Sequence, residues 1–166
     1  LVLPMWEKAS NNVYDMLVGH EVGHALFTPN VDIASFKAPS SYINVIEDAR
    51  IEKLIKRKFP GLCKSFFRGY WELHEQDFFE VQGLDSDEIT LIDRINLHYK
   101  GSNDMVFADD EKVFVERTGN TETFEEVCEL AEDIHAFMKE QKEKREQEKI
   151  DDTDFDMGSE MSNDIQ

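Results

Sequence analysis

The stretch Gly19-His20-Glu21-Val22-Gly23-His24-Ala25-Leu26 decides the fold and the chemistry that we predict for this chain. His20 and His24 are four residues apart, so on a helix their imidazoles project from one face, one turn apart. This spacing allows two ring nitrogens to bind one metal ion at about 2.0–2.1 Å each. Glu21 follows the first histidine, where its carboxylate can hold a water molecule instead of binding the metal. The pattern is the HExxH arrangement of zinc hydrolases, which provides two ligands and a general base.

The residues around this stretch also favour a buried helix. Val18, Val22 and Leu26 are apolar, whereas Gly19 and Gly23 are poor helix formers that each cost about 0.5–1 kcal/mol relative to alanine. Small residues inside a helix indicate that another element approaches closely. The alternative interpretation is an amphipathic helix that carries two histidines and no metal.

A third protein ligand is expected in the run Asn44-Val45-Ile46-Glu47-Asp48-Ala49-Arg50-Ile51-Glu52. Two adjacent carboxylates, Glu47 and Asp48, flank the apolar stripe of this second predicted helix. Carboxylates at a buried edge are costly unless they are paired or bind a metal. The spacing leaves the choice between them open, with a weak preference for Glu47 because it matches the zincins that use a glutamate ligand.

Asp48 is the alternative ligand. Glu52 lies one turn later, so Asp48 would bind the metal and Glu52 would accept a hydrogen bond from the N–H of a metal-binding histidine. The alternative interpretation of the acidic run is a solvated face partnered by Arg50 and Lys53.

Composition limits the classes of protein that fit. The chain has 166 residues, enough for one domain with a sizeable core, and its net charge of −18 disfavours binding to nucleic acid or to an anionic membrane. Cys63 and Cys128 form no CxxC pair and are predicted to be buried free thiols in a reducing compartment, the cytoplasm, or the host cytoplasm if a phage encodes the chain. Neither a signal peptide nor an apolar run long enough to span a membrane is evident.

The hydrophobic periodicity predicts a mainly α domain over residues 1–140 with little or no sheet retained. Helices are expected at about 10–27, 40–59, 62–79, 87–100, 109–117 and from 122 onward. Ser10 and Ser40 or Ser41 are the expected helix caps, and Asp85 with Glu88 has the spacing of a capping box. Residues 1–6 are interpreted as the tail of an edge strand in a truncated N-terminal part, and residues 141–166 as a charged, acidic, disordered linker.

Two motifs together resemble a known group of proteins. The run His20-Glu21-Val22-Gly23-His24-Ala25-Leu26-Phe27-Thr28-Pro29, the acidic run 44–52 and Lys56-Arg57-Lys58-Phe59-Pro60-Gly61-Leu62 resemble the zincin-like metallopeptidase region of T4-like tailed-phage proteins. These are similar to CobT-type proteins and other von Willebrand factor A-linked proteins. The resemblance implies Zn²⁺ at His20 and His24, a third ligand at Glu47 or Asp48, and Glu21 as base. It also implies a von Willebrand factor A domain beyond the acidic linker, which we expect to be missing from this chain.

The expected function is therefore that of a zinc-dependent hydrolase, most simply a metallopeptidase acting on a peptide or protein substrate. Tyr42, Tyr70 and His74 are the candidate donors to the oxyanion of the transition state. The rival hypothesis is a non-catalytic structural or assembly module of a phage or chelatase-like complex.

Overall fold

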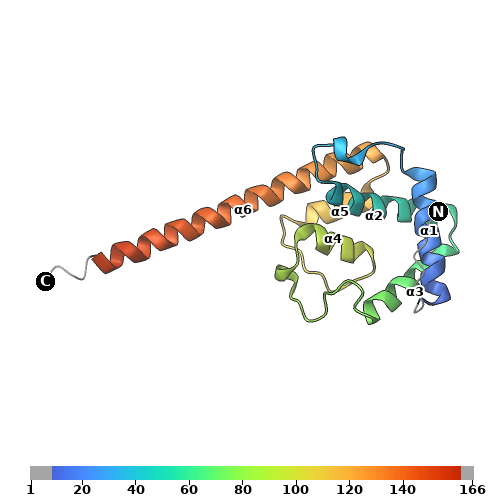
Figure 1. The fold of residues 1–166 in the computed structure, drawn as a ribbon, viewed down its shortest axis with the longest axis horizontal. Coiled ribbons are helices and arrows are strands. Elements are labelled where there is room, and N and C mark those ends of the chain that lie inside the picture. Colours follow the sequence, from blue (N-terminus) through green and yellow to red (C-terminus); the bar gives the residue numbers. More distant parts are fainter. Residues whose placement is uncertain (1–8, 162–166) are drawn as a thin grey trace.

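A computed structural model describes the backbone of residues 9–161 and, in the last helix, the side chains as far as residue 151. The expectation of a mainly α fold is confirmed, because the described residues form helices and no strand (Figure 1). The α-helices are α1 (Asn11–Phe27), α2 (Ser40–Lys58), α3 (Leu62–Glu75), α4 (Leu91–Tyr99), α5 (Lys112–Asn120) and α6 (Phe124–Met161). Two 3-10 turns, Ser86–Glu88 and Ile33–Ser35, lie in the connections. The edge strand predicted for residues 1–6 lies outside the described residues.

The helix that carries the histidines begins and ends where the sequence predicts. The Ser10 hydroxyl accepts a hydrogen bond from the backbone N–H of Val13 at 3.3 Å, and α1 ends at Phe27 before Thr28 and Pro29. The prediction for the start of α2 was less accurate. Pro39 occupies the N-cap position without a side-chain hydrogen bond, so Ser40 is already the first helical residue rather than the cap.

The segment between α3 and α4 differs from the expectation. α3 ends at Glu75 instead of continuing to residue 79, because the chain turns through left-handed backbone conformations at Asp77 (φ 49°) and Glu80 (φ 55°). The predicted capping box at Asp85 and Glu88 is present, but it opens only a single 3-10 turn. α4 starts later, with Thr90 as its cap, so the helix predicted at 87–100 is two separate elements.

Helix α2 lies between two separate groups of buried apolar side chains. The larger group packs α2 against α4, α5 and α6, and we call it the main core: it comprises Ala38, Ile43, Ile46, Leu91, Ile92, Ile95, Phe114, Phe124, Val127, Cys128, Leu130, Ala131 and Ile134. The smaller group joins α1, α2 and α3, and we call it the minor core: it comprises Val13, Met16, Ile55, Phe66, Tyr70 and Leu73. The face of α2 that turns toward α1 carries the acidic residues discussed below.

Glycines allow α1 to pack closely on both of its neighbours. A Cβ atom added at Gly23 would lie 2.9 Å from Ile51 Cδ1 on α2, and one added at Gly69 on α3 would lie 2.9 Å from Met16 Cβ on α1. These distances are shorter than real Cβ contacts, so the small residues are needed for helix packing. The role expected for Gly23 is thus confirmed as close approach of another element, and that element is α2.

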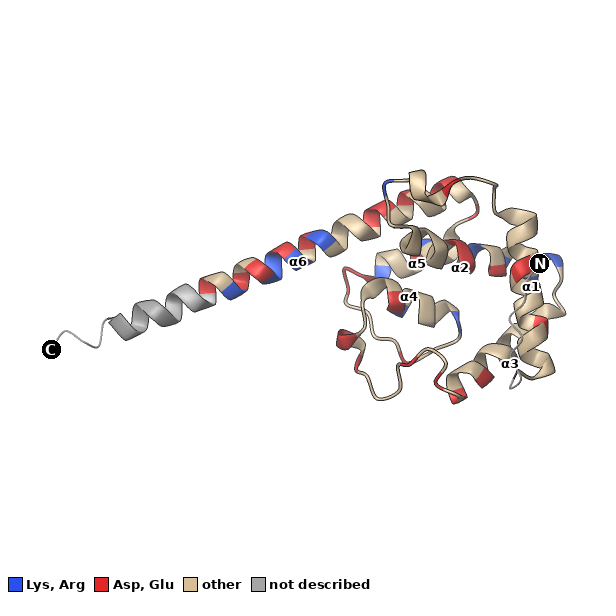
Figure 2. Ribbon diagram, in the orientation of Figure 1, with Lys and Arg blue, Asp and Glu red and all other residues tan. Residues whose placement is uncertain are grey.

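The long helix α6 leaves the globular part of the molecule and projects away from it (Figure 1). Figure 2 shows that its projecting part alternates between acidic and basic residues, which form i,i+4 ion pairs such as Glu140 with Lys144 at 2.7 Å. The helix extends through Met161, so residues 141–161 are helical here and differ from the disordered linker that the composition suggested. The last five residues lie outside the described part of the chain.

Two further expectations concern the cysteines and membranes. Both cysteines are free thiols, as predicted, but only Cys128 is buried, whereas Cys63 at the start of α3 is exposed. Within residues 9–161, every helix is too short or too polar to cross a bilayer.

Candidate metal centre

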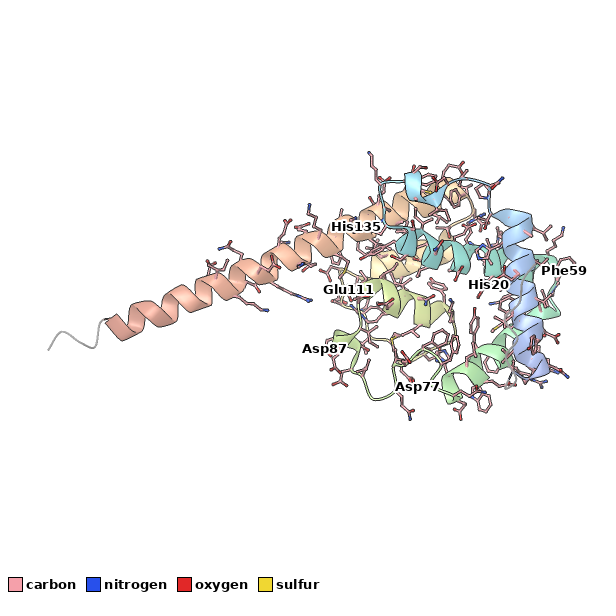
Figure 3. The ribbon with its side chains drawn as sticks, viewed as in Figure 1. His20, Phe59, Asp77, Asp87, Glu111 and His135 are labelled. Atoms are coloured by element: carbon pink, nitrogen blue, oxygen red, sulfur yellow. The ribbon has the colours of Figure 1, made fainter. Side chains whose placement is uncertain are left out.

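Three side chains from α1 and α2 converge on one point. His20 Nε2 lies 3.1 Å from His24 Nε2, and Asp48 Oδ1 lies 3.0 Å from His24 Nε2 and 3.5 Å from His20 Nε2. The two histidines come from successive turns of α1, and Asp48 comes from the facing side of α2. Figure 3 shows His20 on the side of α1 that faces the rest of the helical domain.

The spacing of these three atoms is compatible with ligands of a single metal ion. A tetrahedral ion with ligand bonds of about 2.0–2.1 Å separates neighbouring ligand atoms by about 3.3–3.4 Å. The observed separations of 3.0, 3.1 and 3.5 Å bracket that value. His20, His24 and Asp48 are therefore the residues that would hold a metal ion, which would supply a Lewis acid at this point.

The orientation of His20 is fixed from behind by Glu52. His20 Nδ1 lies 2.8 Å from Glu52 Oε1, and the same oxygen accepts a hydrogen bond from the Tyr70 hydroxyl. Glu52 is almost fully buried, at 3% exposure. A carboxylate can only accept, so His20 Nδ1 carries the proton and the lone pair of His20 Nε2 points toward the cluster. Glu52 thus accepts a hydrogen bond from a histidine N–H, as its spacing from Asp48 predicted.

His24 is held by a longer chain of hydrogen bonds. His24 Nδ1 lies 2.9 Å from Thr28 Oγ1, and the Thr28 hydroxyl donates to Glu47 Oε1 at 2.6 Å. Because the Thr28 proton is committed to Glu47, Thr28 accepts from His24, and His24 Nδ1 is also protonated. The Arg50 guanidinium pairs with both oxygens of Glu47, at 2.6 and 2.8 Å.

The positions of these two protons decide whether a cation must lie among His20, His24 and Asp48. With both Nδ1 atoms protonated, the two Nε2 lone pairs and a carboxylate oxygen of Asp48 face one another with no donor between them. Three acceptors this close repel one another unless a cation lies among them, either a proton on one ring or a metal ion. Burial lowers the pKa of His20, but the hydrogen bond to Glu52 and the negative charges of Asp48 and Glu52 outweigh it and leave the pKa raised.

The second oxygen of Asp48 faces a lysine. Lys100 Nζ, at the C-cap of α4, lies 3.2 Å from Asp48 Oδ2, which leaves Oδ1 for the histidines. Burial raises the pKa of Asp48. A hydrogen bond from His24, in the state in which a proton lies between the two side chains, and the charge of Lys100 outweigh burial and keep the pKa below its ordinary value, so the side chain is an anion at neutral pH. A monodentate carboxylate with one oxygen tied to a cation is a common arrangement for a metal ligand.

The two adjacent acids of α2 therefore have different surroundings. Asp48 lies with His20 and His24 and forms the only group of three or more potential ligand residues found among the described residues. Glu47, which the sequence argument weakly preferred, is 1% exposed and is engaged by Arg50 and Thr28 on the other side of His24. The geometry thus does not support Glu47 as the ligand. It places Glu47 behind Thr28, as part of the support for His24.

Glu21 lies beside the cluster without being held in place. Its side chain is exposed, and none of the other described residues makes a hydrogen bond or an ion pair with it. Of the expected oxyanion donors, Tyr70 is committed to Glu52 and His74 Nε2 lies 2.8 Å from the backbone carbonyl of Lys100. Tyr42 packs edge-on against His135, with ring centroids 5.4 Å apart, away from the histidine pair.

Sequence reasoning missed Thr28 and Lys100. Thr28 had a usable signal, because it lies four residues after His24 and so shares its helix face. Lys100 had none, since it is 52 residues from Asp48 and only the packing of α4 brings it there.

The chain matches no protein-family model, and no curated protein or solved structure shows significant similarity to it. The resemblance to phage and CobT-type proteins therefore rests on the motif residues alone and remains a prediction.

Proposed function

We propose that this chain binds one zinc ion through His20, His24 and Asp48 and acts as a zinc-dependent hydrolase, most simply a metallopeptidase. The observation that carries the proposal is the convergence of three acceptor atoms at 3.0–3.5 Å, with the outer nitrogen of each histidine already committed to a hydrogen bond. Carboxylate and imidazole ligands in a three-residue set with an open fourth position are typical of catalytic zinc sites.

Each residue of the site would have a separate role in the hydrolysis. Zinc, when bound, supplies a Lewis acid that lowers the pKa of a bound water to about 7. Glu21 is close to both histidines in the helix and exposed, so it would accept a proton from the attacking water and pass it to the leaving amine. Glu52 and Thr28 would fix the two imidazole rings. Lys100 would keep Asp48 anionic and monodentate.

A second candidate function has its own support. The absence of an orienting partner for Glu21 among the described residues favours a structural zinc site that joins α1 to α2. In that case the chain is a non-catalytic structural or assembly module, for which a linked von Willebrand factor A domain would be a natural partner. Such a site would hold the ion with the same three ligands but would not turn over a substrate.

The substitution Glu21→Gln separates the two functions. We would measure zinc content and the hydrolysis of a fluorescently labelled unfolded protein, with Asp15→Asn, another exposed acid of α1, as the matched control. The hydrolase proposal predicts unchanged zinc and a loss of activity of about 10²–10⁴-fold for Glu21→Gln alone. Zinc-loaded wild type without zinc-dependent hydrolysis, across a panel of unfolded protein substrates, would favour the structural function.

A further inference from the structure

A large cavity is lined by Tyr70 and His74, whose polar atoms contact residues next to the metal centre. It has a volume of about 1780 Å³ and is bounded by α3, the segment 76–90, α4, the segment 100–111 and one face of α6. Ligand pockets for small molecules measure about 300–1,000 Å³, so this space is large enough for a polypeptide segment. His20, His24 and Asp48 are not among the residues that line it.

The cavity exposes large apolar side chains to solvent. Phe67 is 74% exposed, Trp71 58%, Leu84 45% and Val106 68%, and all four line the cavity. They come from α3 and from the two long connections on either side of α4. Clustered exposed aromatic and aliphatic side chains around a concavity are typical of a surface that binds another molecule.

The charge of the lining is strongly acidic. Eight acidic residues and three basic residues line the cavity, which leaves an excess of five negative charges: Glu75, Asp77, Asp85, Asp87, Glu88, Asp104, Asp110 and Glu111 against Lys56, Arg94 and Arg145. Figure 3 shows Asp77, Asp87 and Glu111 coming from different segments around α4, and Figure 2 shows how few basic residues lie in these segments.

Several of these acids have no cation of their own. Arg94 is committed to Glu111 through two hydrogen bonds of 2.7 Å. Glu75, Asp87 and Asp104 are exposed and make no hydrogen bond or ion pair with any other described residue. Their charges are therefore available to a positively charged ligand, and they repel nucleic acid and anionic lipid.

Two residues connect the cavity to the metal centre. The Tyr70 hydroxyl donates to Glu52, which holds His20, and His74 lies against the backbone of Lys100, which pairs with Asp48. Both Tyr70 and His74 also line the cavity. A chain lying in the cavity would thus be separated from the groups that hold the zinc ligands by this one wall of side chains.

We propose that this cavity binds an extended polypeptide segment that carries Lys or Arg alongside apolar side chains. The apolar residues would accept the apolar side chains, and the excess of acids would select positive charge. This binding does not rest on the function proposed above.

The test uses the full chain and two fluorescein-labelled peptides of equal length. They share their Leu and Phe positions and differ only in carrying Lys or Glu at the polar positions. Fluorescence anisotropy in the presence of a chelator measures binding without cleavage. We expect the Lys peptide to bind at least about tenfold more tightly than the Glu peptide, with an affinity that falls as salt is added.

Substitutions locate the binding site. Trp71→Ala and, independently, Val106→Ser should each weaken binding of the Lys peptide, by about tenfold for the tryptophan. Both side chains are exposed, so the fold is retained, and circular dichroism checks this. Glu75→Gln with Asp104→Asn should reduce both the affinity and its salt dependence. Glu116→Gln with Glu129→Gln, exposed acids that do not line the cavity, should leave binding unchanged.

Several results would overturn the proposal. Equal affinity for the two peptides, or binding that survives both Trp71→Ala and Val106→Ser, would show that the cavity does not select basic segments. Self-association of the chain that is lost in Trp71→Ala would show instead that a second copy occupies the cavity. Selective binding by a chain that takes up no zinc would leave the cavity proposal intact and contradict only the proposed hydrolase.

Discussion

The two sides of α2 are built on different principles. The side that faces α4, α5 and α6 contributes Ile43 and Ile46 to the main core, which is apolar throughout. The side that faces α1 contributes Glu47, Asp48 and Glu52 to a layer of hydrogen-bonded and charged groups over the minor core. One side is stabilised by removing apolar surface from water, and the other requires a cation and an ordered set of partners.

Within α2, one side therefore stabilises the fold and the other side carries the residues of the candidate metal centre. The main core sets the position of α2 whether or not a metal is bound. The polar side then places the acids of α2 against the histidines of α1, but three facing acceptors do not hold together on their own. Metal binding should therefore stabilise the contact between α1 and α2 and leave the main core as it is.

Among the variants that test this comparison, Ile134→Ala in the main core is expected to cause the largest loss in the free energy of unfolding. Ile134 is fully buried, so its truncation should lower the free energy of unfolding by about 2–5 kcal/mol. Urea unfolding with and without zinc measures it. The extra stability gained from zinc should be the same in Ile134→Ala and wild type. A zinc increment that disappears in the variant would show that the two sides of α2 are not independent.

A second variant, Gly69→Ala, tests the packing beneath the metal centre. The added methyl group would meet Met16 Cβ at 2.9 Å and the Asn12 carbonyl oxygen at 3.1 Å, so α1 and α3 must move apart. We expect a loss of about 1–3 kcal/mol in the free energy of unfolding. Gly61→Ala is the matched control, because nothing lies within 4 Å of its added Cβ. Equal stabilities of the two variants would contradict the close packing of α1 on α3.

The polar side is tested by Glu52→Gln, which removes the negative charge behind His20. Loss of such an orienting partner weakens zinc binding by about 10–100-fold. Competition with a zinc-sensitive dye measures the affinity, and Glu129→Gln on the exposed face of α6 is the control. Unchanged affinity in Glu52→Gln would show that the hydrogen bond between Glu52 and His20 does not support the site.

The smallest effect is expected at the surface, where Glu122 joins α2 to the chain before α6. Hydrogen bonds from Arg57 and Lys53 lower the pKa of Glu122 from 4.5 to about 2. A lowered pKa in the folded state means that the stabilisation is complete above pH 4.5 and is lost as the pH falls toward 2. The melting temperatures of wild type and Glu122→Gln should thus differ slightly at pH 7 and converge in acid. A difference that grows in acid would contradict this ion pair.

The sequence predicted local features well because their causes are local. Ser10 caps α1, the histidines share one helix face, and Glu52 lies one turn from Asp48, and each of these follows from helical spacing. The choice between Glu47 and Asp48 could not be made from spacing, since adjacent helical residues differ by about 100° in direction and only the packed position of α1 distinguishes them. Arg50 binds Glu47 and also donates to the Phe27 carbonyl, so Glu47 is engaged away from the histidine pair and Asp48 faces it.

The parts that were not predicted depend on contacts between distant segments. Lys100 reaches Asp48 only because α4 packs on α2, and Tyr70 reaches Glu52 only because α3 packs on α1. The early end of α3 depends on left-handed backbone at Asp77 and Glu80. Aspartate is enriched in this conformation, but a single aspartate in a helical pattern does not place the turn.

The most direct test of the account is the zinc content of the purified chain, measured by mass spectrometry for wild type, Asp48→Ala and Glu47→Gln. The account predicts one zinc per chain in wild type and in folded Glu47→Gln, and none in Asp48→Ala. Zinc that is retained in Asp48→Ala but lost from folded Glu47→Gln would contradict the ligand assignment. A wild-type chain that takes up no zinc, under conditions in which a control protein retains it, would contradict the metal centre itself.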